Sequence, residues 1–443
     1  MRRRRQSRQR LPQQPLEVEI TALSHEGRGV AHLGDETVFI HGALPGERVR
    51  FRYLQRRRGI AEGELEEVLQ QSPERIAPRC VHFGVCGGCS LQHLPAEQQR
   101  RFKEGVLRNQ LERIGRVVPD EWLPVLTGPE WGYRRKARLG VKLVPKKGGV
   151  LVGFRERSSS FVAALESCEV LDPRVGRRLR DLAALVEGLS VARQLPQIEV
   201  AIGDEAVGLV FRHLAPLTAA DQAQLAAFGE QHDFLIYVQP GNEDTVQLLW
   251  PAAGELSYRL PEFDVELAFR PTDFTQVNAE INRAMVSRAI ALLEPQPTDT
   301  VLDLFCGLGN FTLALARRAG HVVGVEGEAG LVGRARDNAR RNGLENCEFH
   351  VANLAGEVRD LPWMRRRYDR ILLDPPRSGA AELIPQIAGL GAPRLVYVSC
   401  NPATLARDAG MLVHEHGYRL RAAGIMDMFP HTAHVESIAV FER

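Results

Sequence analysis

The sequence predicts an α/β protein made of a small β-barrel, a strand-rich central domain and a C-terminal doubly wound parallel sheet. Three observations predict this architecture. Short alternating runs interrupted by glycines fill Leu16–Gln71, and strand-like runs dominate residues 131–270. From Asn278 onward, apolar strand-like runs alternate with helical sequence, which is the pattern of a parallel sheet covered by helices.

The composition is that of a folded chain with several domains. Of 443 residues, 44% are hydrophobic and 25% are charged, which excludes a disordered protein and allows two or three domains of about 150 residues each. No run approaches the roughly 20 apolar residues of a membrane helix, and no apolar region follows the first ten residues as in a secretory signal. We therefore expect a cytoplasmic protein with no membrane partner.

The charge is unevenly distributed along the chain. The net charge is only +2, but residues 1–150 contain 28 Lys and Arg against 17 Asp and Glu, so the remainder is acidic. Clustered basic residues favour a polyanionic partner. The first eleven residues are expected to be a disordered basic tail, which either contacts nucleic acid or is merely solvated.

Residues 12–71 are expected to form the barrel. The alternating runs LEVEITAL, TVFIHGAL and ERVRFRYLQ are separated by glycine corners. Several short strands with such corners are typical of a small closed barrel.

Residues 72–270 are expected to form the central domain, beginning with a segment that holds three of the seven cysteines. A helix is predicted over residues 96–115, ending at Gly115 and packing on the C-terminal domain. Its apolar face is formed by Phe102, Val106, Leu107, Leu111 and Ile114. The remainder is strand-rich, with one helical stretch near residues 173–188 and a basic rim around KARLGVKLV.

Residues 271–443 are expected to form the doubly wound domain. A helix capped by Asn278 precedes the strand-like runs VLDLF, HVVGVE, CEFHVA, RILLD and RLVYVS. The last two runs, YRLRAAGIMDMF and HVESIAVFER, follow each other without a helix and are expected to form an antiparallel pair at one edge of the sheet.

A cofactor site is predicted at the carboxyl ends of these strands. Gly307 and Gly309 form a turn between the first strand and its helix, where the backbone can approach a ligand. A third glycine of the dinucleotide type is missing, and Glu326 ends the second strand, where it can accept both ribose hydroxyls. This combination favours S-adenosylmethionine over NAD. Asn353 and Asp374 follow the next two strands.

Cys400 is the candidate nucleophile. It follows the fifth strand in the run Ser399–Pro402, at the start of a helix whose dipole favours a thiolate. Cys306 and Cys347 are expected to be small buried apolar residues instead. Glu436 begins an apolar strand, where burying a carboxylate costs free energy unless it has a partner or a function. It is therefore the candidate base. Its alternative role is to keep an edge strand soluble.

A thiol and a carboxylate suit methylation of uracil at C5. That carbon is a poor nucleophile until a thiolate adds to C6 and converts the ring to an enolate. A base must then remove the C5 proton so that the thiol is released. The target base must also leave its stack.

Five motifs together resemble those of the RNA uracil-C5 methyltransferases. In this sequence they read FTQVN (274–278), LDLFCGLGNF (302–311), DPPR (374–377), SCNP (399–402) and HTAHVE (431–436). The resemblance implies a class I, Rossmann-like methyltransferase domain using S-adenosylmethionine. It implies cofactor contacts for Gln276, Phe305, Asn310, Glu326, Asn353 and Asp374, the last lying between cofactor and base. It also implies Cys400 as nucleophile, Glu436 as proton acceptor, and Phe274 as a side chain that stacks on the base or, alternatively, packs in the core.

The cysteine spacing predicts a metal site. Cys80, Cys86 and Cys89 are separated by five and two residues, and Cys168 is the nearest fourth ligand. Thiols of a cytoplasmic protein at this spacing indicate metal rather than disulfides. Zinc and a [4Fe-4S] cluster both accept four thiolates, and spacing alone leaves both open.

The same family resemblance implies a [4Fe-4S] cluster on Cys80, Cys86, Cys89 and Cys168, as in the members that methylate 23S ribosomal RNA. The N-terminal barrel is similar to the OB-like TRAM domain of such enzymes. The resemblance therefore implies 23S ribosomal RNA, free or in an early assembly intermediate, as the partner of a monomeric enzyme that does not act on DNA.

Three alternatives accompany this reading. The chain could methylate uracil in transfer RNA, or be an iron-sulfur RNA-binding redox sensor in which Cys400 is inert; only the sensor does not require S-adenosylmethionine. Cytosine-C5 methylation is disfavoured because the Asp374–Gly379 loop lacks the second cysteine that such enzymes use.

Overall fold

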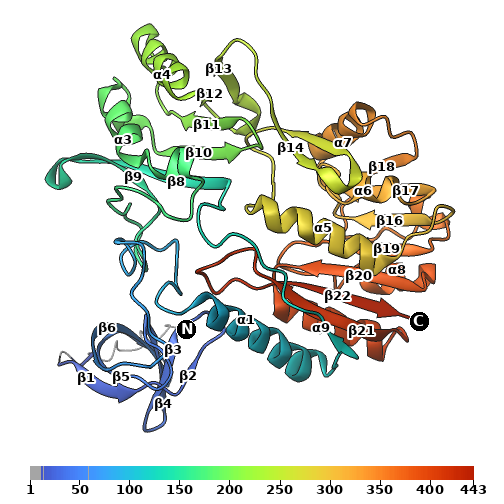
Figure 1. Cartoon of the computed structure of the whole chain (residues 1–443), viewed down its shortest axis with the longest axis horizontal. Coiled ribbons are helices and arrows are strands. Elements are labelled where there is room, and N and C mark those ends of the chain that lie inside the picture. The colour runs from blue at the N-terminus through green and yellow to red at the C-terminus, as the bar shows by residue number, and fades with distance from the viewer. Residues whose placement is uncertain (1–10, 13, 58) are drawn as a thin grey trace, which may run out of the picture. The chain divides into compact units, whose positions relative to one another are not determined.

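The computed structural model describes residues 11–12, 14–57 and 59–443, so the basic tail up to residue 10 lies outside the described residues. Backbone contacts divide the chain into two compact units (Figure 1). The first unit ends at Arg101 and includes His431–His434. The second unit comprises Phe102–Pro430 and Val435–Arg443.

The first unit contains the predicted β-barrel. Its strands are β1 (Leu16–Glu19), β2 (Ala22–Leu23), β3 (Gly29–Leu33), β4 (Glu36–His41), β5 (Arg48–Arg57) and β6 (Ile60–Gln70). They are ordered β1-β5-β6-β4-β3-β2, and only β4 and β6 pair in parallel. Gly63 is required inside this barrel, since a Cβ there would lie 2.4 Å from Cδ2 of the buried Phe51.

The segment after the barrel is tied to the C-terminal run HTAH. The carbonyl of His431 accepts hydrogen bonds from the backbone N–H groups of Ser90 (2.9 Å) and Leu91 (3.0 Å). The side chain of Gln99 accepts from the His431 N–H at 2.7 Å. A stretch near the C-terminus thereby completes the first unit.

The second unit begins with helix α1 (Ala96–Gln110), which crosses the boundary and continues as one π-helical turn, Leu111–Gly115. Leu107 and Leu111 are buried in the core of the C-terminal sheet. Ile114 is 48% exposed, contrary to the predicted apolar face, because the wider π turn rotates it outward. Gly115 ends the helix as predicted, and a Cβ there would lie 2.4 Å from the carbonyl of Ala406.

The central part of the second unit is a six-stranded sheet with the order β13-β12-β11-β10-β8-β9. Its strands are β8 (Lys136–Val144), β9 (Gly149–Gly153), β10 (Gln197–Ile202), β11 (Val207–Arg212), β12 (Phe234–Gln239) and β13 (Gln247–Trp250). A hairpin of β14 (Leu256–Leu260) and β15 (Val265–Phe269) follows.

The prediction of a single helical stretch in this region was wrong. In addition to α2 (Pro173–Gly176) and α3 (Leu179–Gly188), helix α4 covers Ala219–His232. Thr218 and Asp221 form a reciprocal capping box at its start, a local signal that the sequence does carry.

The structure also contains short 3-10 turns at Pro145–Lys147, Ala192–Gln194, Glu243–Thr245, Pro261–Phe263, Pro362–Arg365 and Ala388–Leu390.

The C-terminal sheet has the order β18-β17-β16-β19-β20-β22-β21-β7. Its strands are β16 (Thr300–Leu304), β17 (His321–Glu326), β18 (Cys347–Val351), β19 (Arg370–Leu373), β20 (Arg394–Ser399), β21 (Arg419–Met426), β22 (Glu436–Glu442) and β7 (Glu121–Trp122). The first five are parallel, as predicted. The pair β21–β22 is antiparallel, but β7 adds to β21, so the pair does not form the edge.

Helices cover both faces of this sheet, as a doubly wound fold requires. They are α5 (Ala279–Leu293), α6 (Thr312–Ala316), α7 (Ala329–Arg341), α8 (Ile384–Ile387) and α9 (Pro402–His414). Leu302 and Leu304 point to the face packed by α8, α9 and the end of α1. Asp303 points to the other face, where it contacts Thr312 of α6. Asn278 caps α5 as predicted, accepting from the Ile281 N–H.

Candidate active site

The turn after β16 opens the backbone toward the carboxyl edge of the sheet. Gly307 has φ +56° and no atom near the position of a Cβ, whereas Gly309 has φ +99° and lies so close to α6 that a Cβ would come within 2.2 Å of Leu313. Phe305 has φ +65° although it is not glycine. A bulky residue held in this region is a strained position of the kind found at functional sites.

Glu326 lies beside this turn, at the end of β17. Its Oε2 accepts from the Gly307 N–H at 3.2 Å, and its Oε1 accepts from the N–H groups of Gly327 (2.6 Å) and Glu328 (3.1 Å). A carboxylate fixed by three backbone donors retains acceptor capacity for the hydroxyls of a ribose. The predicted cofactor contacts Phe305 and Glu326 therefore lie at one turn.

Asn310 belongs to a partly buried polar network that the sequence did not reveal. Its Oδ1 accepts from the Tyr258 hydroxyl (2.9 Å) and from the Asn282 amide (3.1 Å), and its own amide donates to Asn282 (3.0 Å). Tyr258 and Asn282 also line a small open hollow together with the predicted contact Gln276. Gln276 and Asn310 are thus brought to the same region from distant segments.

Asn353 follows β18 and is exposed. Its Oδ1 accepts from the Ala355 N–H at 3.1 Å, and the neighbouring Ala352 N–H donates to the Glu326 carbonyl at 3.0 Å. The side chain is therefore held in a turn adjacent to the strand end that carries Glu326.

Asp374, Cys400 and Glu436 meet at the edge formed by β19, β20 and β22. Asp374 and Cys400 directly follow β19 and β20, which are parallel neighbours. Strand β22 runs antiparallel to β20 with Ser437 opposite Ser399, which places Glu436 beside Cys400. The two predicted catalytic side chains and one predicted cofactor contact are therefore adjacent.

Burial raises the pKa values of all three groups. It raises the pKa of Asp374 to about 7. Burial, and then the Asp374 carboxylate, raise the pKa of Glu436 to about 8, against the opposing effect of Arg377. Burial, and then the carboxylates of Glu436 and Asp374, raise the pKa of Cys400 to about 11. These effects outweigh the helix dipole expected to favour the thiolate, so at neutral pH Cys400 is a thiol, Glu436 is ionised in a minority of the molecules and Asp374 in about half of them.

Glu436→Gln is expected to stabilise the fold at alkaline pH. The pKa of Glu436 is raised from 4.5 to about 8, so its contribution to stability is complete below pH 4.5 and is lost as the pH rises through 8. Glutamine stays neutral, so the free energy of unfolding of the variant should exceed that of the wild type by a few kcal/mol at pH 9 and differ little near pH 4.5. Urea denaturation at both pH values measures this; a difference that does not change with pH would contradict the raised pKa.

Phe274 is 72% exposed, so core packing is not its role. Its loop is held from two sides. Lys136 of β8 donates to the carbonyls of Pro271 and Asp273, the latter at 3.0 Å. Arg334 of α7 pairs with the Asp273 carboxylate at 2.6 Å. A ring presented to solvent by a fixed loop can stack on an unpaired base.

Asp303 is a buried acid that sequence reasoning missed. It is fully buried, and burial, opposed by the Thr312 hydroxyl that donates to it at 2.5 Å, raises its pKa to about 7. The sequence did carry a signal for it, because Asp303 is the one charged residue in the apolar run VLDLF (301–305).

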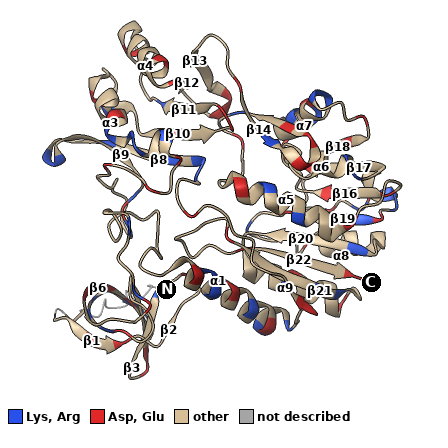
Figure 2. Cartoon of the chain, in the orientation of Figure 1, with Lys and Arg blue, Asp and Glu red and all other residues tan. Residues whose placement is uncertain are grey.

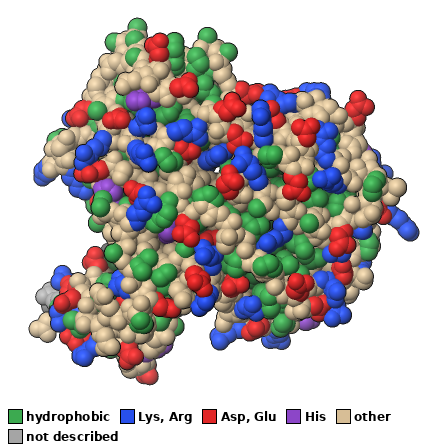
Figure 3. All heavy atoms as spheres, viewed as in Figure 1, with side chains coloured by type: hydrophobic (Ala, Val, Ile, Leu, Met, Phe, Trp, Pro, Cys, Tyr) green, Lys and Arg blue, Asp and Glu red, His purple; other side chains and the backbone are tan. Residues whose placement is uncertain are grey.

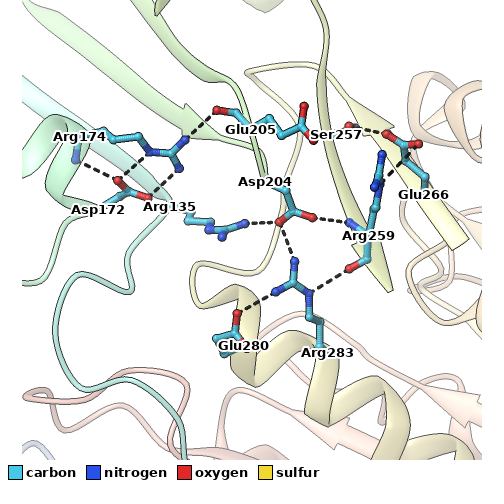
Figure 4. A network of polar contacts seen from close by, with 10 residues as sticks. All are labelled: Arg135, Asp172, Arg174, Asp204, Glu205, Ser257, Arg259, Glu266, Glu280 and Arg283. Carbon is cyan, nitrogen blue, oxygen red and sulfur yellow. Dashed lines mark hydrogen bonds and ion pairs between the residues drawn. The ribbon is translucent and has the colours of Figure 1, made fainter. Parts of the chain in front are cut away.

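A network around Asp204 connects the central sheet to α5 (Figure 4). Its carboxylate accepts from Arg135 (2.6 Å), Arg283 (2.7 Å) and the Arg259 N–H (2.8 Å). Although burial favours the neutral acid, these donors hold the pKa of Asp204 below its usual value. Because Arg135 also lines the hollow beside Gln276, the network fixes one wall of that hollow.

The cysteines fall into two groups. Cys306 is buried as predicted, whereas Cys347 is partly exposed. Cys80, Cys86 and Cys89 lie in the first unit, where the Cys80 carbonyl accepts from the Phe83 N–H at 3.0 Å and the Cys86 sulfur accepts from Gly88 at 3.4 Å. Cys168 belongs to the second unit. In the part of the chain that the structure describes, no three His, Cys, Asp or Glu side chains are arranged as a metal site.

Basic side chains of the barrel and of the β8–β9 hairpin differ in whether they pair with acidic side chains. On the barrel, Arg48, Arg50 and Arg56 all pair with glutamates. On the hairpin of β8 and β9, Lys142 and Lys146 have no acidic partner among the described residues, and Lys and Arg colour its tip (Figure 2). Lys142 and Lys146 on the central sheet are therefore uncompensated cations that could attract a polyanion.

Among the described residues, none of the helices combines the length and the apolar character needed to cross a membrane.

Comparison with known proteins identifies two domains. The family described as tRNA (Uracil-5-)-methyltransferase matches residues 257–443, and the TRAM domain matches residues 9–65. The predicted TRAM barrel and C-terminal methyltransferase domain are thereby confirmed.

Relatives match over the whole length. The 23S rRNA (uracil(1939)-C(5))-methyltransferase RlmD of Alkalilimnicola ehrlichii is 62% identical, with 98% of each chain covered. The RlmD proteins of Nitrosococcus oceani and Xanthomonas campestris are 57% and 56% identical, covering 98% and 99% of each chain. The similarity to RNA uracil-C5 methyltransferases that the five motifs indicated is confirmed.

A solved structure has the same fold. Pyrococcus abyssi tRNA (uracil-54, C5)-methyltransferase in complex with S-adenosyl-L-homocysteine aligns with a TM-score of 0.75 and 25% identity, covering 96% of this chain and 99% of that one. The family description and this structure name transfer RNA, whereas the relatives with over 50% identity name 23S rRNA.

Proposed function

The chain belongs to the RlmD family of 23S rRNA (uracil-C5)-methyltransferases, and from this premise we propose that it transfers a methyl group from S-adenosylmethionine to C5 of a uridine in 23S ribosomal RNA. The observation that carries the proposal is the meeting of Asp374, Cys400 and Glu436 at one sheet edge. We place the reaction in the cytoplasm, on RNA that is free or in an early assembly intermediate, with a monomer as the active species.

Features of the carboxyl edge support the cofactor assignment. Gly307 leaves room for close approach, Glu326 offers acceptors for a ribose, and Gln276 lines a hollow beside Asn310. Phe305 and Asn353 flank these groups. When bound, S-adenosylmethionine would supply an electrophilic methyl group.

The protonation states suggest how the residues share the reaction. Cys400 Sγ would bond to C6 of the uracil while its proton passes to a carboxylate. Glu436 must stay ionised at this stage, because it accepts the C5 proton in a later step. The carboxylate that accepts the proton of Cys400 is therefore Asp374. The enolate carbon C5 would then take the methyl group, with S-adenosylhomocysteine as the leaving group. Glu436 would remove the C5 proton, the C6–S bond would break, and the released thiolate would regain its proton from Asp374.

The raised pKa of Glu436 suits this role. A carboxylate with a pKa near 8 is a stronger base than an ordinary glutamate and is still deprotonated near neutral pH in part of the molecules. Phe274 would hold the target base after it leaves its stack.

The proposed function is tested by incubating the full chain with labelled S-adenosylmethionine and, separately, unmodified 23S rRNA and transfer RNA. We expect 5-methyluridine at a single position of 23S rRNA by nucleoside mass spectrometry and site mapping. Label only in transfer RNA would preserve the chemistry and overturn the substrate. No product with either RNA would favour the iron-sulfur sensor.

We further propose that Cys80, Cys86, Cys89 and Cys168 bind a [4Fe-4S] cluster. The thiol donor set, the turns that gather three of the cysteines in one short segment, and the Gly88 N–H directed at the Cys86 sulfur support it, because N–H···S contacts are typical of iron-sulfur ligation. With four protein ligands, the cluster would be structural or would orient RNA.

Protein purified without oxygen is expected to contain about four iron and four sulfide per chain. Cys89→Ser should lose most of this iron, whereas the matched variant Cys347→Ser should retain it. Iron and sulfide analysis with absorption spectroscopy measures both. Stoichiometric zinc in place of iron, or equal iron in the two variants, would contradict the cluster.

A further inference from the structure

A loop of the central domain packs directly on the backbone of its sheet, at a place where two glycines leave the strands without side chains. Gly140 of β8 and Gly153 of β9 are opposite each other in the register. A Cβ on Gly140 would come within 2.9 Å of Val162 Cγ2, and one on Gly153 within 3.1 Å of the Ala163 carbonyl. Only glycines at these positions let the segment around Val162 approach so closely.

This packing turns the preceding residue, Phe161, away from the sheet. Phe161 lies in the bend just before Val162, whose side chain packs on the sheet, and Phe161 itself is 69% exposed. Its backbone is held on both sides, since its carbonyl accepts from the Glu156 N–H at 2.8 Å and its N–H donates to Ser159 Oγ at 3.0 Å. An aromatic ring is thus presented to solvent from a fixed backbone.

Basic side chains lie in this loop and on the face of the sheet that the loop covers. Because side chains alternate along β8, Arg138 and Lys142 lie on the same face as Gly140, one on either side of it. Arg155 is in the same loop as Phe161 and donates to the Ser160 carbonyl at 2.6 Å. Arg138 pairs with Glu199, whereas Lys142 and Arg155 have no acidic partner in the described part of the chain. In the space-filling view, blue side chains gather over the region of β8 and β9 (Figure 3).

We propose that Phe161, Lys142 and Arg155 form a second nucleotide-binding site, separate from the site of methylation. An unpaired base of the RNA stacks on Phe161, and the two cations bind the adjoining phosphates. Stacking on an aromatic ring beside basic groups is the usual way in which proteins hold single-stranded RNA. The inference rests on the proposed function only in taking RNA as the ligand.

The test is the Phe161→Ala variant of the full chain, assayed with an unmodified 23S rRNA fragment. Loss of one stacked base should weaken RNA binding and raise KM for RNA by roughly 5- to 100-fold, with kcat at saturating RNA unchanged. Phe161→Tyr retains the ring and should restore binding. The matched control is Leu214→Ala, which removes another exposed apolar side chain (65% exposed) of the same unit.

The cations are tested by their salt dependence. Lys142→Gln combined with Arg155→Gln should lower the slope of log affinity against log salt by about 1.4, since each phosphate contact to a single strand contributes about 0.7. An unchanged slope would overturn the phosphate contacts.

The outcomes separate this inference from the proposed function. Equal RNA affinity of Phe161→Ala and Leu214→Ala, with both still methylating 23S rRNA, would overturn the second site and leave the function standing. Weaker RNA binding by Phe161→Ala in a protein that methylates no RNA would refute the methylation and support the second site.

Discussion

Cys400→Ala is expected to abolish methylation, lowering kcat by a factor on the order of 10⁴ or more. Without the sulfur no covalent bond to C6 can form, and C5 of an unactivated uracil is too weak a nucleophile to take a methyl group. The variant should still bind S-adenosylmethionine, because Cys400 follows β20 whereas the glycine turn follows β16 and Glu326 ends β17. Single-turnover assays with labelled cofactor, and calorimetric titration of the cofactor, measure the two properties.

The matched control is Cys347→Ala, which removes a thiol from β18. It should retain activity near that of the wild type, showing that the loss is specific to Cys400. Methylation by Cys400→Ala within tenfold of the wild-type rate would remove the thiol from the mechanism.

Glu436→Gln is expected to separate the first half of the reaction from the second. Cys400 can still add to C6 and C5 can still be methylated, but glutamine cannot accept the C5 proton, so elimination stalls. The protein should therefore remain covalently attached to methylated RNA, with turnover reduced by at least about 100-fold. Denaturing gel electrophoresis with labelled RNA detects the complex.

Glu442→Gln is the matched control, at the other end of β22, where Glu442 pairs with Arg394 and Arg421 at the surface. It should release product normally. Free release of methylated RNA by Glu436→Gln at the wild-type rate would assign the proton transfer to another group.

Much of the site could be predicted because its residues follow strands. Apolar runs such as residues 300–304 identify parallel strands, and the residues after them necessarily gather at one edge. Glu326, Asp374 and Cys400 were located in this way. Glu436 stood out because a carboxylate opens an otherwise apolar strand.

The other features of the site and of the sheet depend on contacts between distant segments, which no local sequence pattern encodes. Tyr258 and Asn282 reach Asn310 from a hairpin and a helix separated from it by 52 and 28 residues. Strand β7 pairs with β21 across about 300 residues, so the edge of the sheet was misplaced. Likewise, the direction of the pKa shift of Cys400 follows from burial beside two carboxylates, which the dipole of α9 alone did not reveal.

The most direct test of the central claim uses an RNA fragment in which the target uridine is replaced by 5-fluorouridine. Fluorine at C5 cannot leave as a proton, so the reaction should stop after methyl transfer with the base bound to the enzyme. Mass spectrometry of the digested complex should find methylated fluorouridine on the peptide that contains Cys400. A methylated product without an adduct, or an adduct on a different cysteine, would contradict the account.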